Sequence, residues 1–304
     1  MRYYLKSDCL IVRGNFRAAS NGVDGGLKDV RTLLNISVPT GFSDNASQYI
    51  SRIANRYGFL QPDFGLLTAV PVNNMCICQY DEITAFVSAA VSDRNRTINI
   101  IVVSAKPFSD AALLGALMTI TEAKMKVINE RKLPSSALST DAVIVAAEKN
   151  SGAPEEFAGP LTEIGVKITK AVSHALLEAL VRFDNYLLVN WGVTRGWSKG
   201  SASMKRKRPS FFIYSRYGGD HWNEWPPEGC SYHPCHNFDN QCCDFCYCPM
   251  YPCKDTEFSE EIDTPRGKIW SCMDCRFIHE SAVVRHLKAN PEASMAELKA
   301  ARKR

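Results

Sequence analysis

Cysteine and histidine side chains gather in the last third of the chain, at spacings that suit metal binding. Of the twelve cysteines in 304 residues, only Cys9, Cys76 and Cys78 lie in the first 190 residues, and the other nine fall between residues 230 and 275. Two C-x2-C pairs are separated by 25 residues, and such pairs let two thiolates reach one tetrahedral ion. The candidate ligands are Cys230, Cys235, His236, Cys243, Cys246, Cys248, Cys253, Cys272, Cys275 and His279.

This set exceeds the four ligands of one tetrahedral ion, so the sequence predicts two structural zinc ions, with Cys242 left over. An iron–sulfur cluster and a disulfide framework are the alternatives. The N-terminal segment lacks the continuous apolar stretch of a secretory signal, and no run of about 18 apolar residues occurs, which favours metal ligation in a cytoplasmic chain without a membrane span. We expect metal to supply most of the folding free energy of residues 211–289, because so short a segment buries little apolar surface.

A second group of reactive side chains lies on a helix predicted from Ser109 to Lys132. At ~100° per residue, Thr121 and Lys124 fall within an apolar stripe formed by Leu113, Leu114, Leu117, Met118, Ile120, Met125 and Ile128. An ammonium on an apolar face must reach water, pair with a carboxylate or act in a site, because burying it alone is costly. Asp110 and Glu122 are the partners expected on this helix, and a purely structural salt bridge is the alternative.

No imidazole is available for nucleophilic catalysis in the first 190 residues. A second helix, predicted from Pro160 to about residue 183, places His174 on its polar, exposed face. A Ser-His-Asp triad or a Cys-His pair is therefore not expected, and the sequence has neither a phosphate-binding loop nor a dinucleotide fingerprint. Hydrolytic chemistry here would use carboxylate, lysine or hydroxyl groups, most simply a carboxylate acting as general base on water or on a threonine. No cofactor is expected for catalysis.

The elements that would position these groups indicate an α/β or α+β domain over residues 1–190, with a mixed sheet and two long helices. Apolar and alternating patterns predict a helix at 46–57 and strands at 65–72, 75–80, 83–91, 97–104 and 140–147. The turn at 20–26 carries two glycine-containing pairs, which permit a tight turn or a close approach of a ligand. The order of the strands cannot be read from these patterns.

The formal charge of +4 comes from one short segment. Residues 191–210 carry six basic and no acidic residues and have the Gly/Ser/Lys composition of a linker, whereas residues 211–304 have a net charge of −3. A solvated basic linker is expected there, followed by the acidic cysteine-rich domain at 211–289 and a charged, frayed tail at 290–304. A zinc-ribbon protein that binds nucleic acid is the alternative class, but the acidic module makes nucleic acid an unfavoured partner.

Several segments in order resemble the adenosylcobinamide amidohydrolase family over residues 8 to 190. They are Asn21-Gly22-x-x-Gly25-Gly26, GLLTAVPV (65–72), TINIIVVSAKPFSDAALLGALMTITEAKM (97–125), STDAVIVAA (139–147) and GPLTEIG (159–165). The resemblance implies a corrinoid-salvage enzyme of mainly archaeal distribution. Such an enzyme cleaves the amide between the aminopropanol arm and the corrin ring, giving adenosylcobyric acid and 1-amino-2-propanol. One departure is the segment 136–140, which reads Ser-Ala-Leu-Ser-Thr where the family has a Thr-Gly-Thr segment.

Amide hydrolysis needs a nucleophile, a stabilised oxyanion and a proton for the leaving amine. We expect Glu122 or Asp141 to activate water and Lys124 to stabilise the oxyanion or protonate the amine, with Thr121 as an alternative covalent nucleophile and Asp110 as a further candidate on the same helix. The turn at 21–26 would donate backbone N–H groups. The candidate substrate-binding residues are Asn21, Gly22, Gly25, Gly26, Thr68, Asn99 and Thr140. A corrinoid sensor without catalytic activity is a third possibility.

The C-terminal part resembles the small cysteine-rich domain found attached to this amidohydrolase family. The similarity is carried by PCH (234–236), CDFCYCPMYPC (243–253) and the Cys272-x2-Cys275-x3-His279 ending. The resemblance implies no particular chemistry for this module. Docking of a protein partner, corrinoid handling or a lid over the first domain are all compatible with its aromatic residues.

Overall fold

The computed structural model describes residues 1–6, 8–59, 63–91, 96–133, 141–191, 212–215, 219–222, 234–236, 238–245, 248–264 and 267–303. The chain divides into two compact units, of which the first holds most residues up to Asp220 and the second holds His221–Arg304. Among the described helices, none combines the length and apolar character needed to cross a membrane.

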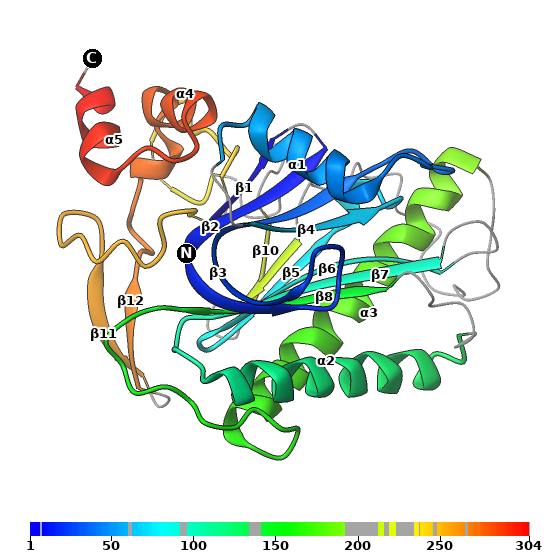
Figure 1. Cartoon of the computed structure of the whole chain (residues 1–304). Helices are drawn as coiled ribbons and strands as arrows, with labels where there is room; N and C mark the ends of the chain where they lie inside the picture. The colour runs from blue at the N-terminus through cyan, green and yellow to red at the C-terminus, as the bar shows by residue number, and fades with distance from the viewer. Residues whose placement is uncertain are drawn as a thin grey trace. The chain divides into compact units, whose positions relative to one another are not determined.

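The first unit is a mixed sheet with three helices (Figure 1). The strands of this sheet are β1 (Arg2–Lys6), β2 (Cys9–Ser20), β3 (Gly26–Ser37), β4 (Asp63–Thr68), β5 (Cys76–Tyr80), β6 (Ile83–Val91), β7 (Arg96–Ser104), β8 (Ala142–Glu148), β9 (Phe212–Ser215) and β10 (Gly219–Trp222), of which Gly219 and Asp220 lie in the first unit. The helices are α1 (Ala46–Arg56), α2 (Asp110–Glu130) and α3 (Glu163–Trp191), with a short 3-10 turn η1 (Val72–Asn74). The predicted mixed sheet with two long helices is confirmed.

Strand order is β10-β9-β5-β6-β7-β8-β2-β3-β4, with β1 paired to β2. The pairs β7–β8, β3–β4 and β5–β9 are parallel, whereas β2–β3, β2–β8, β5–β6 and β6–β7 are antiparallel. The chain thus inserts β8, a late strand, between β7 and β2. This insertion brings the start of β8 next to the turn that joins β2 to β3.

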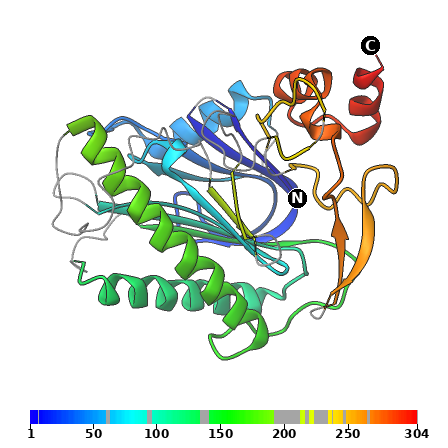
Figure 2. The same cartoon turned by 180° about the vertical axis from the view of Figure 1, so that it is seen from behind.

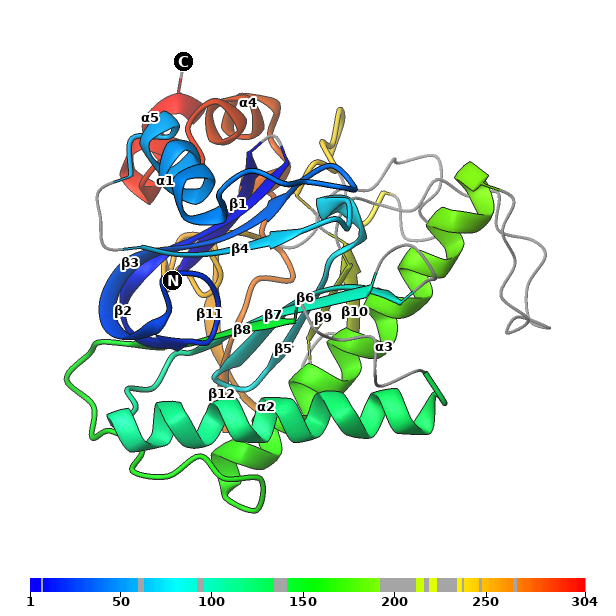
Figure 3. The same ribbon diagram turned by 45° about the vertical axis from the view of Figure 1, so that its right-hand side comes forward.

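The sheet bends strongly, so that β4 faces β7 across its inner side. The side chain of Asn99 on β7 donates a hydrogen bond of 2.8 Å to the carbonyl oxygen of Leu67 on β4. Helix α1 covers β2–β4 from outside, and α2 and α3 cover β5–β8 from the opposite outside (Figures 2 and 3). Between the two halves of the sheet, Phe16, Phe64 and Phe86 are almost completely buried. The core therefore has one apolar layer inside the bend and one under each set of helices.

Helix α2 buries aliphatic and small side chains on the same face. Ser109 caps the helix by accepting a 3.0 Å hydrogen bond from the backbone N–H of Ala112. Leu114 and Met118, predicted to lie in the core stripe, are 50% and 67% exposed, and this prediction is wrong. The buried positions are Ala112, Leu113, Ala116, Thr119, Ile120, Ala123, Lys124, Val127 and Ile128. The alanines let the helix approach its neighbours closely, and the aliphatic side chains supply the apolar contact.

The first unit extends further along the chain than the sequence indicates. Strand β9 pairs in parallel with β5, from Cys76 opposite Phe212 to Gln79 opposite Ser215. The compact first unit accordingly includes residues up to Asp220, whereas the predicted boundaries end the first domain at 190 and begin the second at 211. A short strand after a long linker carries no local pattern that reveals which sheet edge it joins.

The second unit contains the hairpin β11 (Glu260–Thr264) and β12 (Gly267–Ser271), the 3-10 turn η4 (Phe277–His279), and helices α4 (Ser281–Ala289) and α5 (Met295–Arg302). The predicted frayed tail is instead structured. Ser294 and Glu297 form a capping box at the start of α5, and Leu298 is fully buried with Phe277 and Leu287. The tail therefore belongs to the core of this unit.

Candidate functional site

A buried ion pair joins helix α2 to the segment that enters β8. Lys124 Nζ lies 2.8 Å from Asp141 Oδ2, and the two side chains are only 10% and 6% exposed. The other carboxylate oxygen of Asp141 accepts a 2.8 Å hydrogen bond from the backbone N–H of Ile98 on β7. Lys124 therefore pairs with Asp141, and the predicted pairing with Asp110 or Glu122 is wrong.

Burial and hydrogen bonding have opposing effects on the pKa of Asp141. Removal of the carboxylate from water raises its pKa above the ordinary 3.8, and the Lys124 ammonium and the Ile98 N–H offset this rise only partly. A carboxyl group with a raised pKa, held beside a buried ammonium, has the character of an acid–base centre. This pair is the strongest candidate for chemistry in the first unit.

The turn between β2 and β3 lies beside the same end of β8. Asn21 accepts a 2.7 Å hydrogen bond from the Val143 N–H through its side-chain Oδ1, and its own N–H donates to the Val143 carbonyl oxygen at 3.2 Å. Asn21 thus continues the β2–β8 pairing by one residue and lies opposite Val143, two residues after Asp141. Its side chain is exposed, and its Nδ2 amide hydrogens donate to none of the described residues.

Two glycines of this turn occupy positions that do not accommodate a side chain. A Cβ atom at Gly25 would lie 2.4 Å from the Ser20 carbonyl oxygen, and Gly26 has a φ of +102°, so side chains are excluded at both positions. Gly22 N–H donates to Ser20 Oγ at 3.0 Å, and Gly25 N–H donates to the Gly22 carbonyl oxygen at 3.1 Å. The N–H groups of Asn21, Gly22 and Gly25 are therefore already used within the fold. The expectation that they stabilise an oxyanion is not supported by this arrangement.

Polar side chains also line the inside of the bend. Asn99 Nδ2 donates to Asn35 Oδ1 at 3.2 Å, and Asn35 Nδ2 donates to Ser88 Oγ at 3.0 Å. Asn99 is completely buried, and its Oδ1 has no partner among the described residues. Thr68, 3% exposed, accepts the Val70 N–H at 3.1 Å. Asn35 and Ser88 are not among the residues predicted from the sequence, although a polar residue between apolar neighbours in a buried strand is a signal that could find them.

The remaining predicted catalytic residues lie away from the Lys124–Asp141 pair. Glu122 and Thr121 are exposed, and the Thr121 hydroxyl donates to the Leu117 carbonyl oxygen at 2.8 Å. Asp110, in the first turn of α2, forms two 2.7 Å hydrogen bonds with Arg17. Thr140 is outside the described residues. Of the predicted catalytic residues that the structure describes, Lys124 and Asp141 contact each other, and the Asn21 turn lies at the same end of β8.

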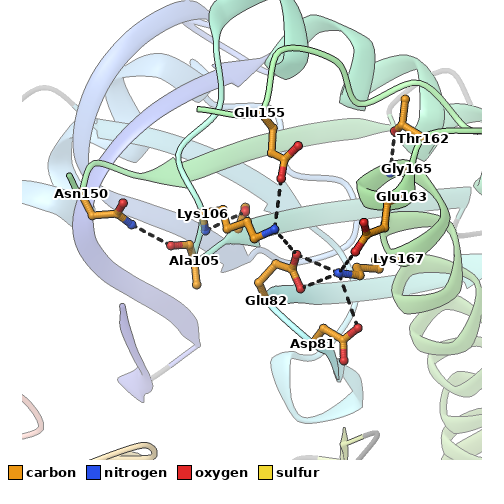
Figure 4. Close-up of polar contacts among 11 residues, drawn as sticks. Asp81, Glu82, Ala105, Lys106, Asn150, Glu155, Thr162, Glu163, Gly165 and Lys167 are labelled. Carbon is orange, nitrogen blue, oxygen red and sulfur yellow. Dashed lines mark hydrogen bonds and ion pairs between the residues drawn. The ribbon is translucent and has the colours of Figure 1, made fainter. Parts of the chain in front are cut away.

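The opposite ends of β7 and β8 carry a network of charges that pair with one another (Figure 4). Lys106 Nζ lies 3.1 Å from Glu155 and 3.2 Å from Glu82, and Lys167 Nζ lies 3.0 Å from Glu82 and 2.8 Å from Glu163. Although burial alone would lower the pKa of Lys167, its bonds to Glu163 and Glu82 outweigh burial and raise it. The network joins the β5–β6 turn to α3 and to the loop at 155, and we assign it a structural role.

The structure describes only some of the predicted metal ligands of the second unit. Cys230 and Cys246 are outside the described residues, whereas Cys235, His236, Cys243, Cys248, Cys253, Cys272, Cys275 and His279 are within it. None of the described cysteines forms a disulfide. In the part of this unit that the structure describes, no three Cys, His, Asp or Glu side chains form a group that could hold a metal ion.

Comparison with known proteins identifies relatives of both units. The family model described as "Adenosylcobinamide amidohydrolase" matches residues 2–186, and a model described as "Cysteine-rich small domain" matches residues 221–302. A relative from Methanocaldococcus jannaschii, described only as an uncharacterized protein, is 53% identical over 55 residues, which are 18% of this chain and 45% of the relative. A "Probable cobalt-factor III C(17)-methyltransferase" of Methanothermobacter thermautotrophicus is 44% identical over 63 residues, which are 21% of this chain and 17% of the relative.

A longer match covers the first unit. The protein named "Adenosylcobinamide amidohydrolase" in Methanosarcina mazei is 38% identical over 187 residues, which are 57% of this chain and 94% of that protein. The match to the family model includes β1–β8, α2, and hence the Lys124–Asp141 pair and the Asn21 turn. The chain is an amidohydrolase and belongs to the adenosylcobinamide amidohydrolase family.

Proposed function

We propose that the first unit hydrolyses the amide that links the aminopropanol arm of adenosylcobinamide to the corrin ring. The products are adenosylcobyric acid and 1-amino-2-propanol, which returns a scavenged corrinoid to cobalamin synthesis. The observation that carries this proposal is the buried Lys124–Asp141 pair at the start of β8, in a chain that belongs to the adenosylcobinamide amidohydrolase family. The pair supplies a carboxylate and an ammonium within hydrogen-bonding distance of each other, and these two groups can serve as the base and the acid of amide hydrolysis.

In this mechanism Asp141 is the general base. Its carboxylate takes a proton from water as the water oxygen attacks the amide carbon, and a tetrahedral oxyanion forms. The ammonium of Lys124 stabilises the negative charge and then donates a proton to the leaving amine nitrogen when the C–N bond breaks. The exposed amide of Asn21 is a further donor near the same strand end. Glu122 is less well supported as the base because it lies on the exposed face of α2.

The raised pKa of Asp141 gives a pH prediction. Because a general base works only when ionised, kcat/KM should increase with pH through a limb that lies above the ordinary carboxyl pKa of 3.8. Stability should change in the opposite direction. A carboxyl whose folded pKa exceeds its unfolded pKa holds its proton more tightly in the folded state, so its contribution to stability decreases as pH rises from 3.8 through the folded pKa.

Two pH series check this prediction. One measures kcat/KM and the other measures the free energy of unfolding by denaturant titration, and both compare the wild type with Glu122→Gln. An acidic limb that disappears in Glu122→Gln would assign the base to Glu122 instead of Asp141.

The function is tested by incubating the full chain with adenosylcobinamide and separating the products by chromatography. Formation of adenosylcobyric acid together with 1-amino-2-propanol is the expected result. Corrinoid binding without products would favour a sensor that lacks catalytic activity. No product and salt-sensitive binding of DNA or RNA would favour the nucleic-acid-binding class.

A further inference from the structure

The side chain of Asn21 lies on the same face of the sheet as that of Asp141. A Cβ atom at Gly22 would lie 3.7 Å from Ala142 Cβ and 2.9 Å from Leu66 Cδ2, so Gly22 and Ala142 face the inside of the bend. Because successive residues of paired strands face opposite sides of a sheet, Asn21 and the residues on either side of Ala142 face outward. The ion pair between Asp141 and helix α2, which covers the outer face, agrees with this assignment.

The strand register places these two side chains close together. Ser20 pairs with Ile144, and the Asn21 N–H donates to the Val143 carbonyl oxygen at 3.2 Å. Asn21 therefore lies directly opposite Val143, and Asp141 is its diagonal neighbour on the same face. Diagonal neighbours on antiparallel strands are about 7–8 Å apart. A small group such as an amide carbonyl can therefore lie between the two side chains.

A hydrogen bond determines which end of the Asn21 side-chain amide is free. Asn21 Oδ1 accepts the Val143 N–H at 2.7 Å. This bond identifies the oxygen end of the amide, because an amide NH₂ group cannot accept a hydrogen bond. The Nδ2 group keeps two hydrogens that none of the described residues accepts. Since the side chain is exposed, these hydrogens are open to a ligand.

Neighbouring donors are already engaged within the fold. Lys124 Nζ lies 2.8 Å from Asp141 Oδ2, and the Ile98 N–H donates to the other carboxylate oxygen at 2.8 Å. The N–H groups of Gly22 and Gly25 are bonded inside the turn. A donor that is held in place and has no internal acceptor can stabilise charge that develops on a substrate without first breaking a bond of its own.

We propose that the Asn21 side-chain amide is a catalytic hydrogen-bond donor to the carbonyl oxygen of the scissile amide, a role that rests on the proposed hydrolysis of adenosylcobinamide. Asp141 takes a proton from water as the water oxygen bonds to the amide carbon, and the π electron pair of the carbonyl moves onto its oxygen. Asn21 Nδ2 donates to this oxyanion. When the electron pair returns, the C–N bond breaks and the leaving nitrogen takes a proton from Lys124. The turn thus contributes a side-chain donor, which Lys124 complements with its charge.

Asn21→Asp separates the two functions of the side chain, because a carboxylate still accepts the Val143 N–H but has no hydrogen to donate. We expect kcat to decrease by about 10²–10³-fold, the usual effect of removing one oxyanion donor, while KM and the free energy of unfolding stay near the wild-type values. Asn21→Ala should show a similar decrease in kcat and should also be less stable, since the Val143 N–H then loses its acceptor. Asp24→Asn exchanges the same two groups within the same turn, at a residue with a φ of +52° that asparagine tolerates. This control should keep wild-type turnover.

Steady-state kinetics with adenosylcobinamide and denaturant unfolding of the full chain provide the measurements. A carboxylate at position 21 would also raise the pKa of Asp141, so kcat is compared on the pH plateau of each protein. A wild-type kcat for Asn21→Asp on its plateau would overturn the proposal. An increased KM with unchanged kcat would overturn it too, because Asn21 would then bind substrate and transition state equally.

The wild type separates failure of this role from failure of the proposed function. If the wild type does not hydrolyse adenosylcobinamide, the proposed function is wrong and the role of Asn21 is wrong with it. If the wild type and Asn21→Asp are equally active, only the role of Asn21 is wrong.

Discussion

Asp141→Asn is expected to lower kcat/KM for adenosylcobinamide by about 10²–10⁴-fold, the usual contribution of a positioned general base. Lys124→Met should lower it by a similar factor, because it removes the only ammonium that the described structure places against Asp141. The matched controls are Glu122→Gln and Lys126→Met, two exposed positions on the same helix. Both controls should retain wild-type turnover. Steady-state kinetics on the four purified variants provide the measurement.

Stability must be measured with activity, since breaking one side of a buried ion pair commonly costs about 3–5 kcal/mol. In the double variant Lys124→Met/Asp141→Asn neither side chain is charged, so part of this loss should be recovered. Activity should not recover with it. If the double variant regained both stability and turnover, the pair would be a structural salt bridge and the catalytic assignment would be wrong.

Gly165→Ala is expected to reduce the free energy of unfolding by about 1–3 kcal/mol, the typical effect of overpacking. A Cβ at this position would lie 1.8 Å from the carbonyl oxygen of Gly159 and 3.0 Å from Thr162 Oγ1. The Thr162 hydroxyl donates to the Gly159 carbonyl oxygen and accepts the Gly165 N–H, which together start α3. Figure 4 shows the bond between Thr162 and Gly165. The clash involves backbone, so no flexible side chain can relieve it.

Gly159→Ala is the matched control for this prediction. A Cβ at Gly159 would meet nothing within 4 Å, and its backbone does not have a positive φ. Denaturant unfolding of the two variants should therefore separate them clearly. Equal free energies of unfolding for the two variants would show that Gly165 is not packed closely against the Gly159 carbonyl oxygen.

The sequence by itself determined the local elements and the family. Alternation and helical periodicity predicted β5, β6, β7, α1 and α2 to within a few residues, because those patterns depend only on which side of an element is buried. The TINIIVV, ITEAK and TDAVIVA segments carried the resemblance to the amidohydrolase family, which the family model confirms. These segments also contain Lys124 and Asp141, both predicted as catalytic residues. The predicted partners of Lys124, Asp110 and Glu122, were wrong.

The tertiary structure alone decided which candidates meet. Asp141 reaches Lys124 because β8 inserts between β7 and β2, and strand order has no local signature in the sequence. Internal hydrogen bonds use the N–H groups of Asn21, Gly22 and Gly25, and packing leaves Leu114 and Met118 of α2 exposed while Leu113 and Ile120 are buried. Likewise β9 joins the first sheet and Leu298 enters the core of the second unit. In each case the deciding free energy comes from contacts between segments distant in the chain, and such contacts leave no pattern within either segment.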